Sequence, residues 1–131
     1  MDVKALWKEA VEARKFSYSP YSKFKVGAAL LCEDGTVIRG CNVENSAYGP
    51  TNCAERTAFF TAIANGQRDF KAIAVVGGED DLVDCYPCGV CRQVMSEFCY
   101  PDTFQIICGK TEEEIEVFSL KDLLPKGFTK K

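Results

Sequence analysis

The sequence predicts an α/β protein, a three-layer α-β-α sandwich around a mixed five-stranded sheet. Two observations lead to this fold class. Helix-like and strand-like segments follow one another in the order α-β-β-α-β-α-β-β-α. The segment Ala72–Val76, in the middle of that order, is unbroken apolar sequence, as expected of a central strand buried on both faces. Such a strand needs helices on both faces of its sheet. With 131 residues, the chain is expected to form a single domain over residues 1–131.

A helix and a hairpin are predicted near the N-terminus. Residues 2–16 carry apolar side chains at helical spacing, behind Asp2 as a candidate N-cap. Two strand-like runs, 25–32 and 36–43, lie on either side of Asp34-Gly35. An Asp-Gly pair between two such runs is a strong signal for a β-hairpin.

Helices and strands alternate in the rest of the chain. After a loop at 45–52 that is rich in Asn, Ser, Gly and Pro, residues 53–64 consist of good helix formers and end at an Asn-Gly pair. The buried strand at 72–76 is followed by an acidic loop. The elements expected after that loop are a helix over 88–98, strands over 104–108 and 115–118, and a helical turn over 119–124.

The charge and apolar patterns argue against two kinds of partner. The formal net charge is -3 and the pI is about 5.0, without a long basic run. Because affinity for a nucleic-acid backbone comes from clustered Lys and Arg, we expect no nucleic-acid partner. No apolar run is long enough to span a bilayer, and Met1–Glu9 is too polar for a signal peptide, so no membrane partner is expected.

The sequence contains eight cysteines and no histidine. Since no export signal precedes the cysteines and several lie beside apolar segments, we expect a reducing compartment and a cytoplasmic protein. Cys32, Cys41, Cys99 and Cys108 are expected to be small buried hydrophobic residues. The lack of histidine excludes Cys-His and Ser-His catalysis, and any metal must be bound by Cys, Asp or Glu.

Two short motifs combine potential metal ligands with a carboxylate: Cys53-Ala54-Glu55 and Pro87-Cys88-Gly89-Val90-Cys91. Each begins a predicted helix, where free backbone N–H groups and the helix dipole stabilise thiolates. Three cysteine ligands would leave a fourth position on zinc open for water, and Glu55 would lie near that position. Arg56 follows directly, and its guanidinium would offset the negative charge of the thiolates.

The spacing leaves other metal sites open. Cys85, Cys88 and Cys91 are in register, and with Cys53 they would form a structural zinc site of four cysteines without an open position. The C-x-x-C-x-x-C spacing also occurs in iron-sulfur ligation and a lone C-x-x-C in redox sites, so spacing alone does not choose among these.

The residues of these motifs carry a family resemblance. Cys-Ala-Glu-Arg at 53–56 followed by Pro-Cys-Gly-x-Cys-Arg-Gln at 87–93 resembles the small, homotetrameric class of zinc-dependent cytidine deaminases. The likeness covers nearly the whole chain and extends to residues 21–29, 40–45 and 123–125. Thr51-Asn52 departs from the family pattern, and Cys85 has no role in it.

The resemblance implies a cytidine deaminase-like fold and a specific chemistry. It implies one Zn²⁺ per chain on Cys53, Cys88 and Cys91, with Glu55 as the proton shuttle, and the Ala54 backbone N–H on the carbonyl oxygen of the base. The reaction implied is hydrolytic deamination of cytidine and 2'-deoxycytidine to uridine and 2'-deoxyuridine in pyrimidine salvage, by a homotetramer.

The resemblance also implies substrate contacts, each with a simpler alternative. Asn42 and Glu44 would bind the ribose hydroxyls, or would instead bond to their own loop. Phe24 would pack on the base, or would be an ordinary core residue. Tyr48 and Phe128 would reach the active site of a neighbouring subunit, or would be a loop tyrosine and a residue of a fraying tail.

Two further functions remain as alternatives. A related deaminase could act on an aminopyrimidine antibiotic or a free base, although Asn42 and Glu44 favour a nucleoside. A structural-zinc interaction module would have no use for Glu55 beside the metal, which favours the enzyme.

Overall fold

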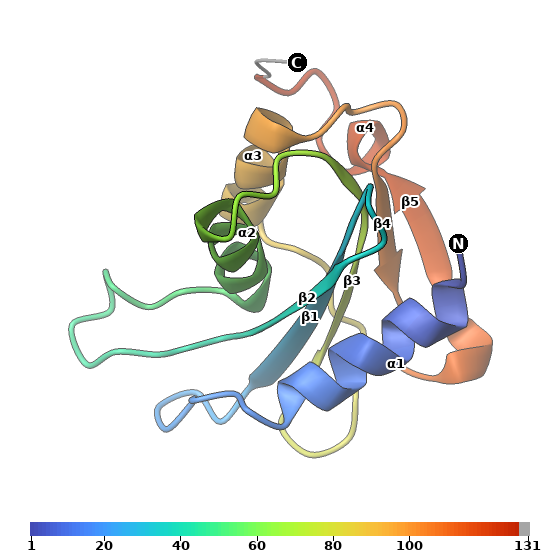
Figure 1. The fold of residues 1–131 in the computed structure, drawn as a ribbon. Coiled ribbons are helices and arrows are strands. Elements are labelled where there is room, and N and C mark those ends of the chain that lie inside the picture. Colours follow the sequence, from blue (N-terminus) through green and yellow to red (C-terminus); the bar gives the residue numbers. More distant parts are fainter. Residues whose placement is uncertain (129–131) are drawn as a thin grey trace.

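The structure is a computed structural model that describes residues 1–128. It contains one sheet with helices on both faces (Figure 1). The elements within the described residues are α1 (Val3–Arg14), β1 (Lys25–Cys32), β2 (Val37–Cys41), α2 (Ala54–Ala64), β3 (Phe70–Gly78), α3 (Gly89–Phe98), β4 (Gln105–Cys108), a 3-10 turn (Glu112–Glu114), β5 (Glu116–Ser119) and α4 (Leu120–Leu123).

The sheet is mixed and five-stranded, in the order β2-β1-β3-β4-β5. Three neighbouring pairs are antiparallel, and β3 and β4 are parallel. A parallel pair needs a crossover connection, which α3 provides between β3 and β4. The prediction of a mixed five-stranded sheet is confirmed.

Two apolar layers cover the two faces of the sheet. Alternate residues of the central strands point to opposite faces, as the pleat requires. Leu30 and Ile73 belong to the core between the sheet and the helices α2 and α3, whereas Ala29 and Ala74 pack in the layer under α1. Figure 1 shows α1 on one side of the sheet and α2 and α3 on the other, so the predicted three-layer sandwich is confirmed.

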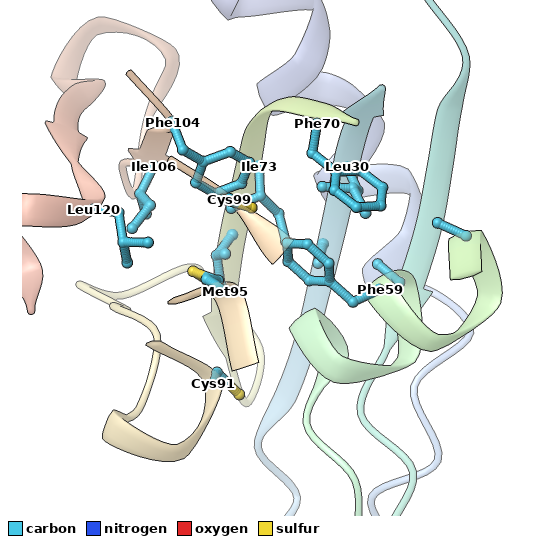
Figure 2. Packing of buried hydrophobic residues seen from close by; sticks show 14 of the residues in the cluster. Leu30, Phe59, Phe70, Ile73, Cys91, Met95, Cys99, Phe104, Ile106 and Leu120 are labelled. Carbon is cyan, nitrogen blue, oxygen red and sulfur yellow. The ribbon is translucent and has the colours of Figure 1, made fainter. Parts of the chain in front are cut away.

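An aromatic cluster fixes α2 and α3 relative to each other. Phe59 of α2 lies with its ring centroid 6.0 Å from that of Phe98 of α3 and 5.1 Å from that of Phe70. Figure 2 shows side chains from the sheet and both helices meeting in this layer. Because burial of a phenylalanine contributes about 1.5–3 kcal/mol, the cluster stabilises the packing of the two helices against each other.

The hairpin differs from the prediction at its second strand, which ends at Cys41 rather than at Val43. The Asn42 side chain turns inward instead of continuing the strand. Its Nδ2 donates to the Phe24 carbonyl at 2.8 Å, and its Oδ1 accepts from the Val26 N–H at 2.9 Å. Side-chain bonds of this kind compete with the regular ladder and end the strand.

Three of the four cysteines expected in the core are buried: Cys32, Cys99 and Cys108. The prediction for Cys41 is wrong, because this residue is only half-buried on the edge strand β2. None of the helices among residues 1–128 has the length and apolar character needed to cross a membrane.

Candidate active site

The first turns of α2 and α3 bring three cysteines together. Cys53 is the N-cap of α2, Cys88 is the N-cap of α3, and Cys91 lies in the first turn of α3. Their sulfur atoms all lie within 4.8 Å of one another. The Cys53 and Cys88 sulfurs are 3.9 Å apart, and those of Cys88 and Cys91 are 3.4 Å apart. The three cysteines that the sequence singles out therefore form one group.

This group fits a zinc ion with one open position. Tetrahedral zinc with Zn–S distances of ~2.3 Å separates its sulfur ligands by about 3.8 Å, close to the separations found here. Cys85 is not a member of the group, which contains only Cys53, Cys88 and Cys91 among the described residues. The structure thus favours three protein ligands over the closed four-cysteine site.

Hydrogen bonds favour the thiolate form of Cys53. The Arg56 Nη2 donates to the Cys53 sulfur at 3.1 Å. Hydrogen bonding from the Cys91 thiol, together with the Arg56 guanidinium, lowers the pKa of Cys53 to about 5. The same bond to Cys53, and burial, raise the pKa of Cys91. A thiolate is the form of cysteine that binds metal, and the positive guanidinium offsets part of its charge.

Glu55 is a buried carboxyl group beside these sulfurs. Its side chain is only 4% exposed, in the first turn of α2. Burial, and to a smaller extent the negative charge of Cys53, raises the pKa of Glu55 to about 7. A carboxyl group with a pKa near the working pH can both accept and donate a proton, as general acid-base catalysis requires.

A pocket of about 230 Å³ opens next to this group. It adjoins two of the three sulfurs and Glu55, and apolar and amide side chains form much of its wall. The residues that line it are Phe24, Val26, Asn42, Thr51, Asn52, Cys53, Ala54, Glu55, Cys85, Tyr86 and Cys88.

Phe24 forms one wall of the pocket, half-buried and close to the backbone of β3. A Cβ atom on Gly77 would lie 2.9 Å from Phe24 Cε2 and 2.8 Å from the Cys85 sulfur. A side chain at position 77 would therefore displace Phe24 or Cys85 from its place beside the strand. Asn42, which also lines the pocket, is 9% exposed.

Glu44 lies outside the pocket lining and is bonded to a neighbouring loop. Its carboxylate accepts hydrogen bonds from the N–H groups of Tyr21 at 3.0 Å and Ser22 at 3.1 Å, and from the Ser22 hydroxyl. The hydrogen bond from the Ser22 hydroxyl contributes most to lowering the pKa of Glu44. Glu44 is therefore an anion held in place by the loop that contains Tyr21 and Ser22.

Tyr48 and Phe128 are not part of the pocket formed by one chain. Tyr48 is 78% exposed, with a φ of 61° in the loop between β2 and α2, and Phe128 is 86% exposed. The Phe128 carbonyl accepts bonds from Gln93 Nε2 at 2.7 Å and Ser96 Oγ at 2.9 Å, so the backbone is held while the ring is exposed.

Cys85 and Tyr86 both line the pocket, although the sequence analysis assigned neither of them a substrate contact. Burial raises the pKa of Cys85 to about 12, so its thiol stays protonated. The signal available in the sequence was their place directly before Pro87-Cys88.

Comparison with known proteins agrees with this site. A family model described as the cytidine and deoxycytidylate deaminase zinc-binding region matches residues 1–107. The cytidine deaminase of Halalkalibacterium halodurans is 53% identical over 129 residues, which are 98% of this chain and 96% of that protein. The cytidine deaminase of Sporosarcina psychrophila is 52% identical over 130 residues, which are 99% of this chain and 93% of that protein.

A solved structure shows the same similarity in three dimensions. The crystal structure of cytidine deaminase from Burkholderia pseudomallei superposes with a TM-score of 0.89 at 50% identity, covering 98% of this chain and 100% of that one. Since the sequence, the fold and the group of three cysteines agree with one another, the chain belongs to the cytidine deaminase family of zinc-binding enzymes.

Proposed function

We propose that this enzyme catalyses hydrolytic deamination of cytidine and 2'-deoxycytidine to uridine and 2'-deoxyuridine in pyrimidine salvage. The observation that carries the proposal is a buried carboxyl group, Glu55, that lines a pocket together with two of the three grouped cysteines, Cys53 and Cys88. We further propose a single catalytic domain over residues 1–131, assembled as a homotetramer in the cytoplasm.

Cys53, Cys88 and Cys91 are the proposed ligands of one Zn²⁺ per chain. When bound, the ion lowers the pKa of a coordinated water and so supplies the nucleophile for hydrolysis. Glu55 accepts one proton of the attacking water and delivers it to N3 of the pyrimidine, then accepts the remaining proton of that water and passes it to the amino nitrogen at C4, which leaves as ammonia. Its pKa of about 7 lets one carboxyl group serve both directions.

Other residues are proposed to hold the substrate. Phe24 packs against the base, and the Ala54 N–H, at the start of α2, binds the carbonyl oxygen of the base. Asn42 uses one amide hydrogen on the Phe24 carbonyl and has a second for a sugar hydroxyl. Glu44, fixed by its loop, is the proposed acceptor for the sugar hydroxyls, and Tyr48 and Phe128 act in a neighbouring subunit's site.

The direct test is the loss of cytidine absorbance when the enzyme is added. We expect turnover of cytidine and 2'-deoxycytidine, abolished by a zinc chelator and restored by added zinc. A protein that holds zinc but leaves cytidine unchanged would favour the structural-zinc alternative. Turnover of cytosine or of an aminopyrimidine antibiotic in place of cytidine would contradict the nucleoside assignment.

A second prediction concerns a charged substrate. No lysine or arginine is among the residues that line the pocket. A 5'-phosphate that enters it would therefore lose water without gaining a cationic partner from this lining, which is a costly exchange. We expect kcat/KM for cytidine to exceed that for its 5'-monophosphate by roughly 100-fold or more. Equal values, measured in one assay, would contradict the proposed pocket.

A further inference from the structure

Cys88 differs from the other two proposed ligands in how its place is fixed. Cys91 is buried in the core and Cys53 is half-buried, but Cys88 is exposed. It ends the segment that joins β3 to α3. Its sulfur accepts a hydrogen bond from the Cys91 N–H at 3.4 Å, but burial holds Cys88 less firmly than the other two cysteines. The position of this sulfur therefore also depends on what anchors the residues directly before Cys88.

Tyr86, two residues before Cys88, is anchored to the edge strand β5. Its hydroxyl donates to Glu116 Oε1 at 2.9 Å. Its ring lies edge-on to Phe118, with the ring centroids 5.9 Å apart and an interplanar angle of 73°.

Arg92 anchors Pro87, the residue between Tyr86 and Cys88, to the helix α4. Its Nε donates to the carbonyl of Pro87, directly before Cys88, at 2.7 Å. Its Nη1 donates to the carbonyl of Leu123, the last residue of α4, also at 2.7 Å. One guanidinium therefore joins the backbone beside Cys88 to the end of α4, where a cation is also favoured by the helix dipole.

We propose that Tyr86, through Glu116, and Arg92 are positioning residues that hold Cys88 in place for zinc. They tie the residues before Cys88 to β5 and α4, which supply no ligand themselves. The proposal rests on the proposed role of Cys88 as a zinc ligand. Partners that orient a metal ligand commonly govern metal affinity, and here they act through the backbone beside the ligand.

The test measures zinc release from purified, zinc-loaded enzyme to a chromophoric chelator. We expect Tyr86→Phe and Glu116→Ala each to release zinc roughly three- to tenfold faster, because each removes one hydrogen bond to a charged group. Glu116→Gln keeps an acceptor and should remain near the natural rate. Arg92→Lys, which loses the two-carbonyl contact, should accelerate release by ~10-fold or more.

Three controls separate positioning from general destabilisation. Glu113→Ala changes an exposed glutamate on the preceding turn and should leave release unchanged. The thermal unfolding of the chelator-treated Tyr86→Phe and Glu116→Ala variants should match that of the chelator-treated natural protein. The double variant Tyr86→Phe/Glu116→Ala should release zinc no faster than the single variants, because both remove the same bond.

The outcomes are distinct. The inference is overturned if Tyr86→Phe and Glu116→Ala both release zinc within twofold of the natural rate. It is also overturned if the double variant releases zinc faster than either single variant, or if Glu116→Gln accelerates release as much as Glu116→Ala does. If the natural protein holds zinc and deaminates cytidine in those experiments, the proposed function still stands. A natural protein without zinc or activity overturns the proposed function and this inference together.

Discussion

At the scale of single residues, Glu55 is the group whose surroundings differ most from those of an ordinary carboxylate. It is almost fully buried, and burial raises its pKa to about 7. Removal of a carboxylate from water is unfavourable, and a buried carboxyl group with a raised pKa beside three thiols is typical of a functional site. It is not needed to complete the sulfur group, which fits zinc without it.

We predict that Glu55→Gln folds and binds about one zinc per chain but loses nearly all turnover. The amide keeps the shape of the side chain and cannot shuttle protons, a function typically worth ~10² to 10⁴ in rate. Zinc content and kcat are measured on the same sample of the variant and compared with those of the natural protein. Loss of zinc from the variant would instead identify Glu55 as a ligand.

The sequence predicted the grouped cysteines but could not decide the place of Cys85. A spacing of three residues places Cys88 and Cys91 on the same face, because they are the N-cap and a first-turn residue of α3. Cys85 has the same spacing from Cys88, but it lies before the helix in irregular backbone, where helical spacing does not predict which side chains are neighbours. Only the folded chain shows that the Cys85 sulfur lines the pocket without joining the group.

At the scale of elements, two glycines allow helices to pack directly on the sheet. A Cβ atom on Gly40 of β2 would lie 2.4 Å from the Ala54 carbonyl oxygen, at the start of α2. One on Gly27 of β1 would lie 2.2 Å from the Ala10 carbonyl oxygen of α1, on the opposite face. In both cases the clash is with backbone, so a helix must move.

We predict that Gly40→Ala and Gly27→Ala both destabilise the fold, each by about 1–3 kcal/mol or more. Only Gly40→Ala should also speed zinc release, because α2 carries Glu55 and begins at Cys53, whereas α1 carries no site residue. Chemical unfolding and chelator transfer on the two variants form a matched pair. Equal zinc release from both would show that the site does not depend on the placement of α2.

The elements themselves were largely predictable, and the exceptions have physical causes. The apolar run Ala72–Val76 marked the central strand, which extends in the structure to Phe70–Gly78. The end of β2 was not predictable, because the Asn42 side chain bonds to Val26 in β1 and to Phe24 directly before it. Local patterns carry no information on partners that are distant in sequence.

At the scale of the whole molecule, the C-terminal tail presents a fixed backbone and an exposed ring. Gln93 and Ser96 both donate to the Phe128 carbonyl, and the Phe128 side chain is 86% exposed. The two hydrogen bonds hold the residue that carries this exposed ring in place. The sequence alone predicted a neighbour for this ring only through its family resemblance, and the alternative was a fraying tail.

We predict that Phe128 completes the active site of a neighbouring subunit in the proposed homotetramer. Homo-oligomers of Phe128→Ala and of Glu55→Ala should both be poorly active, the first for lack of the ring and the second for lack of the proton shuttle. Refolding the two variants together creates some sites with Glu55 from one chain and Phe128 from another. Those sites should raise activity above the sum of the two parents.

In the control, Phe128→Ala is refolded with the double variant Glu55→Ala/Phe128→Ala instead of with Glu55→Ala. Because neither chain in this mixture has the Phe128 ring, activity should not rise above the sum of the two parents. Subunit exchange is checked independently by mass, since a failure to mix would also give no gain. With exchange established, absence of a gain from the two single variants would mean that Phe128 acts within its own chain or has no role in catalysis. A gain only in the pair that restores both groups identifies the ring as a residue shared between subunits, because no single chain in that mixture carries both.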